Sequence, residues 1–232
     1  METNFDLSTR VIMPIEQPPF PVRSALYFLE GEYLLRYPNP NGPGAVSKFI
    51  TAADVSAAFT HTEQDSGYVP AGVVRWGRCV RGRFFVYSTP PQKVTIQVKT
   101  ESLTVPIPRL VLLAIENTHY LWALKGQHLN KNDVAYHAPF PNIYSDGKVC
   151  WGTNVPPVSE AEQARRAWDT FIQSGFNNDL ANGKSREYHQ DILVMLRDLH
   201  QRKVSKYPVA DLVPADNNRI IGAMIDTQLE GK

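Results

Sequence analysis

The first half of the chain is a series of short apolar runs separated by Gly, Pro and polar residues, a pattern typical of strands. The runs SALYFLEG (24–31) and EYLLRYP (32–38) precede the turn-forming stretch PNPNGPG and predict a small hairpin. A helix is predicted to start at Thr51, because Asp54 three residues later completes the pattern of an N-cap. This region therefore predicts a hairpin followed by a helix.

Five more extended runs follow, and the connections between them are short. Because short connections leave no room for parallel crossovers, we expect an antiparallel meander. In the run 93–99 polar and apolar residues alternate, as in a strand with one face in water. Asn117 and Thr118 lie between the last two runs and predict a hairpin. The runs are GVVRWGRCV (72–80), RFFVYS (83–88), KVTIQVK (93–99), RLVLLAIE (109–116) and HYLWALKG (119–126).

The second half has helical periodicity. Ser159 and Glu162 form a candidate capping box, and a second helix is predicted from Ser185. Strands first and helices later predict an α+β domain with helices against the sheet. We expect one domain over residues 15–213, with an additional N-terminal hairpin, and a loose tail over residues 214–232.

Composition narrows the classes of function. With 232 residues and 43% hydrophobic side chains, the chain can bury a substantial core. Lys plus Arg total 24 against 23 for Asp plus Glu. The chain therefore has no strong net charge that would attract nucleic acid or an anionic membrane. No apolar run reaches the length of a bilayer span, and the first residues lack the pattern of a secretory signal. A cytoplasmic protein is expected.

The cysteines and histidines indicate neither a disulfide nor a metal site. Cys79 and Cys150 are the only two cysteines, and a cytoplasmic setting favours free thiols. The six histidines are scattered without zinc-ligand spacing. We expect no cofactor and no metal, and Cys79, within a strand pattern, is interpreted as structural.

The segment FPNIYSDGKVC (140–150) contains the strongest turn signal, and its register decides what Cys150 faces. A two-residue loop of Asp146 and Gly147 would put Asn142 and Cys150 on opposite faces of the hairpin. A three-residue loop, with Gly147 in the left-handed conformation, would place Asn142 directly across from Cys150. Their Cβ atoms would then lie roughly 4.5 to 5.5 Å apart, close enough for the amide to reach an oxyanion formed at the sulfur. The pattern leaves both registers open.

A cysteine beside an amide donor, with no base assigned to it, is suited to carrying an acyl group. A cysteine hydrolase needs a base to form its thiolate and to activate water. Exchange of a thioester does not need such a base, because the incoming group is already activated and a cysteine of ordinary pKa has some thiolate near neutral pH. The amide then matters when an amine attacks and negative charge develops on oxygen.

The same segment resembles the active-site signature of ubiquitin-conjugating enzymes, which has His-Pro-Asn, a short Gly-containing loop and the catalytic Cys. Phe140 departs from the signature, standing where the family has a histidine whose role is chiefly structural. The matching residues are Pro141, Asn142, Ile143, Gly147, Val149 and Cys150.

A longer resemblance covers roughly residues 20–214 and includes VPIPRLVLLAIE, LWALKG, AWDTFIQSGF and KYPVADLVP. These stretches are similar to the PRTRC system protein B family, bacterial proteins of the ubiquitin-conjugating fold encoded on plasmids or mobile elements. The resemblance implies a transferase with Cys150 as thioester carrier and Asn142 as oxyanion stabiliser. It also implies three partners: a ThiF-like adenylating enzyme, a ubiquitin-like modifier and a JAB metalloprotease.

Other residues of the segment have two interpretations each. Asp146 is most simply a turn former, and the alternative is a base for an incoming lysine. His137 is an ordinary histidine or takes over the packing role of the motif histidine, and Trp151 is a core or rim aromatic or a contact for the modifier. Phe140, Pro141 and Gly147 are expected to shape the loop.

Two rival functions remain open. Phe140 motivates the first, a catalytically inactive interaction module that keeps the ubiquitin-conjugating fold, which full burial of Cys150 would favour. The second is a cysteine hydrolase, which requires a histidine within hydrogen-bond reach of Cys150.

Overall fold

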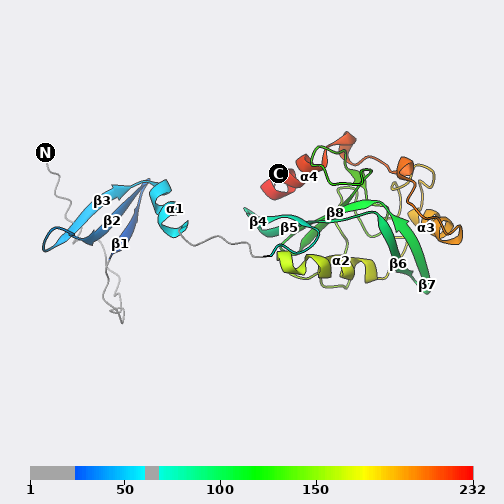
Figure 1. Cartoon of the computed structure of the whole chain (residues 1–232), viewed down its shortest axis with the longest axis horizontal. Coiled ribbons are helices and arrows are strands. Elements are labelled where there is room, and N and C mark those ends of the chain that lie inside the picture. The colour runs from blue at the N-terminus through cyan, green and yellow to red at the C-terminus, as the bar shows by residue number, and fades with distance from the viewer. Residues whose placement is uncertain (1–23, 61–67, 232) are drawn as a thin grey trace. The chain divides into compact units, whose positions relative to one another are not determined.

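Three short antiparallel strands and one helix form the first unit of the chain (Figure 1). The structure is a computed structural model that describes residues 24–60 and 68–231, so the expected domain start at residue 15 lies outside the described residues. The two compact units fall within residues 1–65 and 66–232. The elements of the first unit are β1 (Ala25–Leu29), β2 (Glu32–Pro38), β3 (Ala45–Ile50) and α1 (Ala52–Thr60).

The predicted hairpin and helix start of this unit are confirmed. Leu29 pairs with Glu32 across the β1–β2 turn. Thr51 Oγ1 accepts from the backbone N of Asp54, while the Asp54 carboxylate accepts from the backbone N of Thr51. Strand β3 was not predicted, because its AVSKFI sequence follows a long Pro- and Gly-rich turn and has only one weakly apolar face.

The second unit contains a five-stranded antiparallel sheet in the order β10-β9-β8-β5-β4 and a separate hairpin, β6–β7. The expected meander is therefore interrupted, because β5 pairs with β8 rather than with β6. Strand β7 was missed, since Pro106 within it argues against a strand. The bounds are β4 (Val73–Cys79), β5 (Gly82–Thr89), β6 (Gln92–Val98), β7 (Glu101–Ile107), β8 (Arg109–Ile115), β9 (Thr118–Leu124) and β10 (Tyr136–His137).

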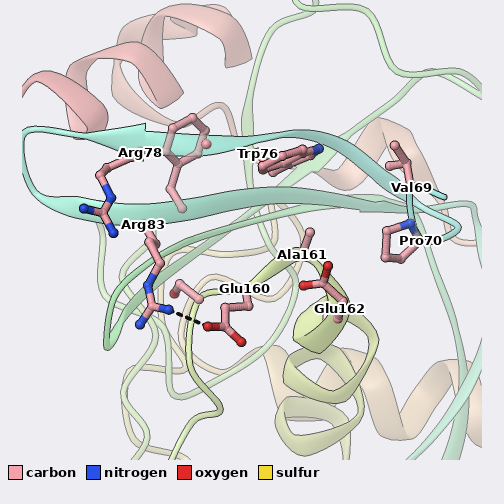
Figure 2. Close-up of a pocket in the computed structure, with 11 residues that line it drawn as sticks. Val69, Pro70, Trp76, Arg78, Arg83, Glu160, Ala161 and Glu162 are labelled. Atoms are coloured by element: carbon pink, nitrogen blue, oxygen red, sulfur yellow. Dashed lines mark hydrogen bonds and ion pairs between the residues drawn. The ribbon is translucent and has the colours of Figure 1, made fainter. Parts of the chain in front are cut away.

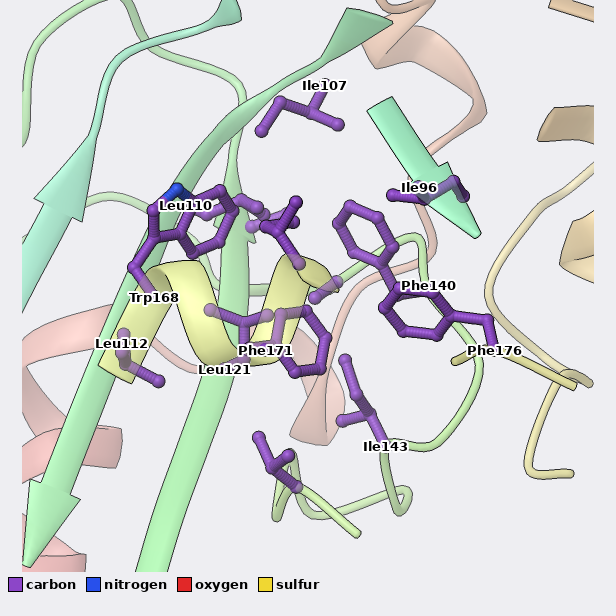
Figure 3. Close-up of a cluster of buried hydrophobic side chains, with 14 of the residues drawn as sticks. Ile96, Ile107, Leu110, Leu112, Leu121, Phe140, Ile143, Trp168, Phe171 and Phe176 are labelled. Atoms are coloured by element: carbon purple, nitrogen blue, oxygen red, sulfur yellow. The ribbon is translucent and has the colours of Figure 1, made fainter. Parts of the chain in front are cut away.

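The central strands of the large sheet are buried on both faces. Along β8, Leu110, Leu112 and Ala114 enter one apolar core. Val111 and Leu113 enter a second core on the opposite face. Figure 3 shows the first core, where side chains of β8 and β9 meet those of α2 and of the segment before Cys150. Burial on both faces explains why these strands read as continuous apolar runs rather than as an alternation.

Three helices of the second unit flank the sheets, and both predicted helix starts needed correction. The hydroxyl of Ser159 donates to the backbone O of Glu116 and not to a helix end, so the predicted capping box does not form. Asp191 caps the later helix by accepting from Leu193 N at 2.8 Å, so that helix starts at Ile192 and not at Ser185. The helices are α2 (Ala164–Gln173), preceded by a short 3-10 helix (Ala161–Gln163), α3 (Ile192–Gln201) and α4 (Ile221–Glu230).

The segment expected as a loose tail from residue 214 instead ends in α4, which packs on the sheet. α2 and α4 lie on opposite sides of the large sheet (Figure 1). The sequence pattern of this helix was weak because α4 is short and has no capping side chain at its start. Its buried residues are Ile221, Met224, Ile225 and Leu229. The protein is thus a mixed α+β structure with antiparallel sheets, and none of its described helices is long and apolar enough to cross a bilayer.

Replacing Ile221 with Ala tests the packing of α4. Ile221 is fully buried, so Ile221→Ala should lower the free energy of unfolding by about 2–5 kcal/mol in urea denaturation. Asp226 on the exposed side of α4 forms an ion pair with Arg75, and both side chains are about half exposed. Asp226→Ala should cost about 0.5 kcal/mol or less. Equal effects of the two substitutions would contradict the packed arrangement.

Candidate active site

Residues 142–150 form a tight hairpin, called the 142–150 hairpin below, with a three-residue loop. Ile143 pairs with Val149 in an antiparallel bridge. Tyr144 N donates to Lys148 O at 2.8 Å, and Cys150 N donates to Asn142 O at 2.8 Å. Asn142 therefore lies directly across from Cys150, which is the second of the two registers that the sequence left open.

Gly147 makes this loop fit against the sheet. Its φ of 91° lies in the left-handed region that favours glycine. A Cβ at this position would also stand 2.4 Å from Nε1 of Trp122 on β9. Gly147 O accepts from Leu121 N at 2.8 Å, which attaches the loop to β9. Both backbone conformation and close contact therefore require glycine here.

The two faces of the hairpin differ in burial. Ile143 and Val149 are buried in the core. Residues on the opposite face point away from that core because strand side chains alternate. This outer face carries the half-buried Cys150 and the exposed Tyr144 and Lys148. The half-buried Asn142 lies opposite Cys150 in the backbone register. A cleft of about 530 Å³ opens beside it, lined by Tyr144, Ser145, Asp146, Lys148, Val149 and Cys150.

The segment from Gly175 to Lys184 holds the hairpin from the side. Asn142 has a φ of 59°, and its backbone N donates to Asp179 O at 2.9 Å. Its side-chain Nδ2 donates to Gly175 O at 3.4 Å. Lys184 Nζ donates to Ile143 O at 2.7 Å. These three hydrogen bonds fix the strand that precedes the loop.

Lys184 is an unexpected buried cation in this arrangement. Its side chain is only 3% exposed, and burial lowers its pKa to about 8. The same buried region lowers the pKa of His137, first through burial and then through the charge of Lys184. No local sequence pattern indicated a buried Lys184, because an isolated lysine in a polar stretch is usually a surface residue.

Tyr144 is a second residue that the sequence did not single out. It lies diagonally from Cys150 on the outer face, and its interaction with the Cys150 side chain is the main cause of its raised pKa. The phenol therefore stays protonated and can donate a hydrogen bond toward the sulfur. Asp146 accepts from Lys148 N at 2.9 Å through Oδ1, which is the turn-forming geometry expected for it.

Trp151 and Phe140 both pack toward the core. The half-buried Trp151 ring lies edge-on to His119 with centroids 5.1 Å apart. Phe140 is fully buried between Phe171 and Phe176, with centroids 5.5 and 5.7 Å away. Figure 3 shows Phe140 beside these two rings.

The remaining predicted residues lie around the hairpin. Pro141 is buried immediately before it. His137 is half-buried on β10 and lines a separate cleft of about 610 Å³ with Asp146 and Arg219. Cys79 ends β4, half-buried, and both cysteines are free. Cys150 and Cys79 are therefore separate thiols in different parts of the second unit.

A cleft of about 390 Å³ between the β4–β5 hairpin and the start of α2 contains no residue of the 142–150 hairpin (Figure 2). An ion pair between Arg83 and Glu160 occupies part of its wall, beneath the half-exposed Trp76. Over residues 24–60 and 68–231, no three His, Cys, Asp or Glu side chains gather as metal ligands. The outer face of the hairpin, where Cys150 carries a free thiol beside a cleft, is therefore the candidate site.

Comparison with known families gives one result. The sequence model of prokaryotic E2 family D matches residues 46–215 of this chain, which include the whole hairpin. No curated protein and no solved structure shows detectable similarity to the chain.

The buried Lys184 predicts a specific dependence of stability on pH. Between about pH 8 and 10.5 the folded state has lost the Lys184 proton while the unfolded chain still binds it. The unfolding free energy of the wild type should therefore rise with pH relative to Lys184→Met, by up to about 3 kcal/mol across that range. Urea denaturation near pH 7 and near pH 10 measures this. Lys93→Met, at an exposed position, should show no such difference, and parallel pH profiles for wild type and Lys184→Met would exclude this effect.

Proposed function

The chain belongs to prokaryotic E2 family D, and on this premise we propose that it carries a ubiquitin-like modifier as a thioester on Cys150 and transfers it to an amine. The observation that carries the proposal is the register of the hairpin, with Asn142 across from Cys150 beside an open cleft. In the first step the Cys150 thiolate attacks the thioester carbonyl presented by the activating enzyme, whose thiolate leaves. In the second step an amine attacks, the C–S bond breaks and Cys150 is released.

The position of Cys150 supports the loading step. Cys150 is half-buried and lines the cleft, and in our proposal the incoming thioester enters this cleft. The thiolate is the reactive form. Tyr144 and Lys148, both exposed, line the same cleft as Cys150.

The Asn142 amide supports the transfer step. A carboxamide has two N–H donors, and the hydrogen bond to Gly175 O uses one of them. In our proposal the second donates to the oxyanion that forms when the amine attacks the thioester. The bond to Gly175 and the left-handed backbone hold the amide in place before substrate arrives, which is the preorganisation that such stabilisation needs.

Further roles follow from the resemblance to the PRTRC system protein B family. We propose that a ThiF-like adenylating enzyme loads Cys150 in the cytoplasm, and that a JAB metalloprotease processes the modifier or its conjugates. Asp146, at the rim of the cleft, would accept a proton from the attacking amine. Trp151, half-buried and next to Cys150 in the chain, would contact the modifier's tail.

The inactive-module alternative is weakened by where Phe140 lies. Phe140 motivates that alternative because it replaces the motif histidine, yet its ring is enclosed by other aromatic rings in the core. Cys150 is not fully buried, contrary to what an inactive module favours. The departure from the motif therefore affects packing behind the hairpin more than the chemistry on its outer face.

The hydrolase alternative gains no support from His119 or His137. His119 is fully buried, its ring lies against Trp151, and burial lowers its pKa to about 4. His137 lines a different cleft from Cys150. These placements favour transfer over hydrolysis.

Loading of Cys150 can be tested directly. Incubation with a ubiquitin-like modifier, a ThiF-like adenylating enzyme from the same organism and ATP should give an adduct that a thiol reductant removes, because thioesters exchange with thiols. Cys150→Ala should abolish this adduct on non-reducing gels, and Cys79→Ser should retain it. An adduct that persists in Cys150→Ala would refute the assignment.

Transfer can be separated from loading at Asn142. Asn142→Gly removes the amide and keeps the left-handed backbone accessible, whereas Asn142→Asp keeps the shape and removes the N–H donors. Both variants should load Cys150 but discharge it to a free amine roughly 10²–10³-fold more slowly in single-turnover chase experiments. Normal discharge by Asn142→Gly would argue against a role for the amide in transfer.

A further inference from the structure

We propose that Lys148 is an internal acceptor, which takes the acyl group from Cys150 and becomes modified on its own side-chain amine. The inference rests on the proposed thioester at Cys150 and adds a modification site two residues away from it. The product is an amide on Lys148 Nζ and a regenerated Cys150 thiol.

The register of the 142–150 hairpin places the two groups together. Lys148 and Cys150 lie on the same strand with one residue between them, so both side chains project from the outer face. Their Cα atoms are about 6.6 Å apart if the strand is extended, a span that a lysine side chain can cover. Both residues also line the same cleft of about 530 Å³.

The surroundings leave the Lys148 amine available. Lys148 is exposed and forms no ion pair within the described part of the chain. Its backbone N donates to Asp146 Oδ1, which brings that carboxylate to the same rim of the cleft. Lys184, by contrast, is enclosed and hydrogen-bonded to Ile143 O, so it cannot approach the sulfur.

The step balances without any further reactant. The free-base Nζ of Lys148 attacks the thioester carbonyl, the C–N bond forms, the C–S bond breaks and the electron pair passes to Sγ. The proton lost by nitrogen goes to Asp146 or to water and then to the Cys150 thiolate. An amide replaces a thioester, so the transfer is not reversed by thiols.

Proximity favours this internal transfer. Well-oriented intramolecular reactions reach effective concentrations of about 10⁵–10⁸ M. Transfer to Lys148 would therefore compete with transfer to external amines at ordinary concentrations. It would discharge the thioester whenever no external acceptor arrives, and a modified Lys148 would then obstruct the cleft.

A small activated thioester tests this without the natural modifier. The probe is the thioester of acetyl-Gly-Gly with 2-mercaptoethanesulfonate, applied to the full chain carrying Cys79→Ser, so that Cys150 is the one remaining thiol. After removal of the probe, the protein is incubated near pH 8, and hydroxylamine then cleaves the remaining thioesters. We expect a hydroxylamine-resistant acyl group on Lys148, detected by peptide mass spectrometry and by loss of tryptic cleavage after Lys148.

Matched variants separate internal transfer from other routes. Lys148→Arg keeps the charge but removes the nucleophilic amine, so the resistant product should fall at least about tenfold while the labile thioester persists longer. Lys93→Arg, at an exposed lysine of β6, should behave as the parent does. Cys150→Ala should give no acylated Lys148, because the acyl group must pass through the sulfur.

Three results would overturn the proposal. They are a stable thioester on Cys150 with Lys148 unmodified, acylation of Lys148 in Cys150→Ala, and a transfer rate that falls on dilution, which would indicate transfer between molecules. The first of these leaves the proposed function intact, because the thioester has formed. Failure of the probe to acylate Cys150 at all would instead count against the accessible thiol on which both proposals depend.

Discussion

A single backbone register decides which side chains surround the candidate nucleophile. A shift by one residue in a hairpin moves every side chain to the opposite face. With a two-residue loop, Cys150 would face Ile143, and Asn142 would point away from it. The observed register needs Gly147, because its positive φ fits the three-residue loop and its missing side chain lets the loop rest on Trp122. The chemistry on the outer face is therefore fixed by a glycine that takes no part in it.

Holding that register requires the fold to bury a charge. Removing an ammonium group from water costs several kcal/mol, and one hydrogen bond to Ile143 O offsets only part of it. The same burial lowers the pKa of Lys184, because it disfavours the charged form of the amine. A methionine of similar length would avoid the cost but would leave the carbonyl of Ile143 without its donor. The buried lysine thus lowers the stability of the fold but fixes the position of the strand that carries Asn142.

The sequence predicted the parts of the fold that local patterns determine. The β8–β9 hairpin followed from two apolar runs around Asn117, and the start of α1 followed from Thr51 and Asp54, because each depends on neighbours in the chain. The pairing of β5 with β8 could not be predicted, since it depends on the β6–β7 hairpin leaving the sheet. Helix α4 was missed for a related reason. Its apolar residues pack against the second face of the sheet, which a local sequence pattern does not reveal.

Local sequence patterns likewise predicted some residues of the site and missed others. The spacing of Asn142, Gly147 and Cys150 was visible in the sequence, and glycine at position 147 allowed the correct register to be formulated. Lys184 reaches the hairpin from 41 residues away, so nothing local indicated it. Tyr144 was overlooked because a tyrosine in a strand is ordinarily a packing residue, and only the register places it beside the sulfur.

Phe140 shows how the core and the site depend on each other. It belongs to the same apolar cluster as Ile143 and Val149, whose burial orients the inner face of the hairpin. An imidazole at position 140 would need a hydrogen-bond partner in this enclosure, and the neighbouring rings of Phe171 and Phe176 offer none. The phenylalanine instead contributes to a tight aromatic contact behind the hairpin. Since interiors pack densely, a change in this cluster is transmitted to the inner face of the hairpin and so to the separation of Asn142 and Cys150. The departure from the conjugating-enzyme motif is therefore best understood as a different means of supporting the same hairpin.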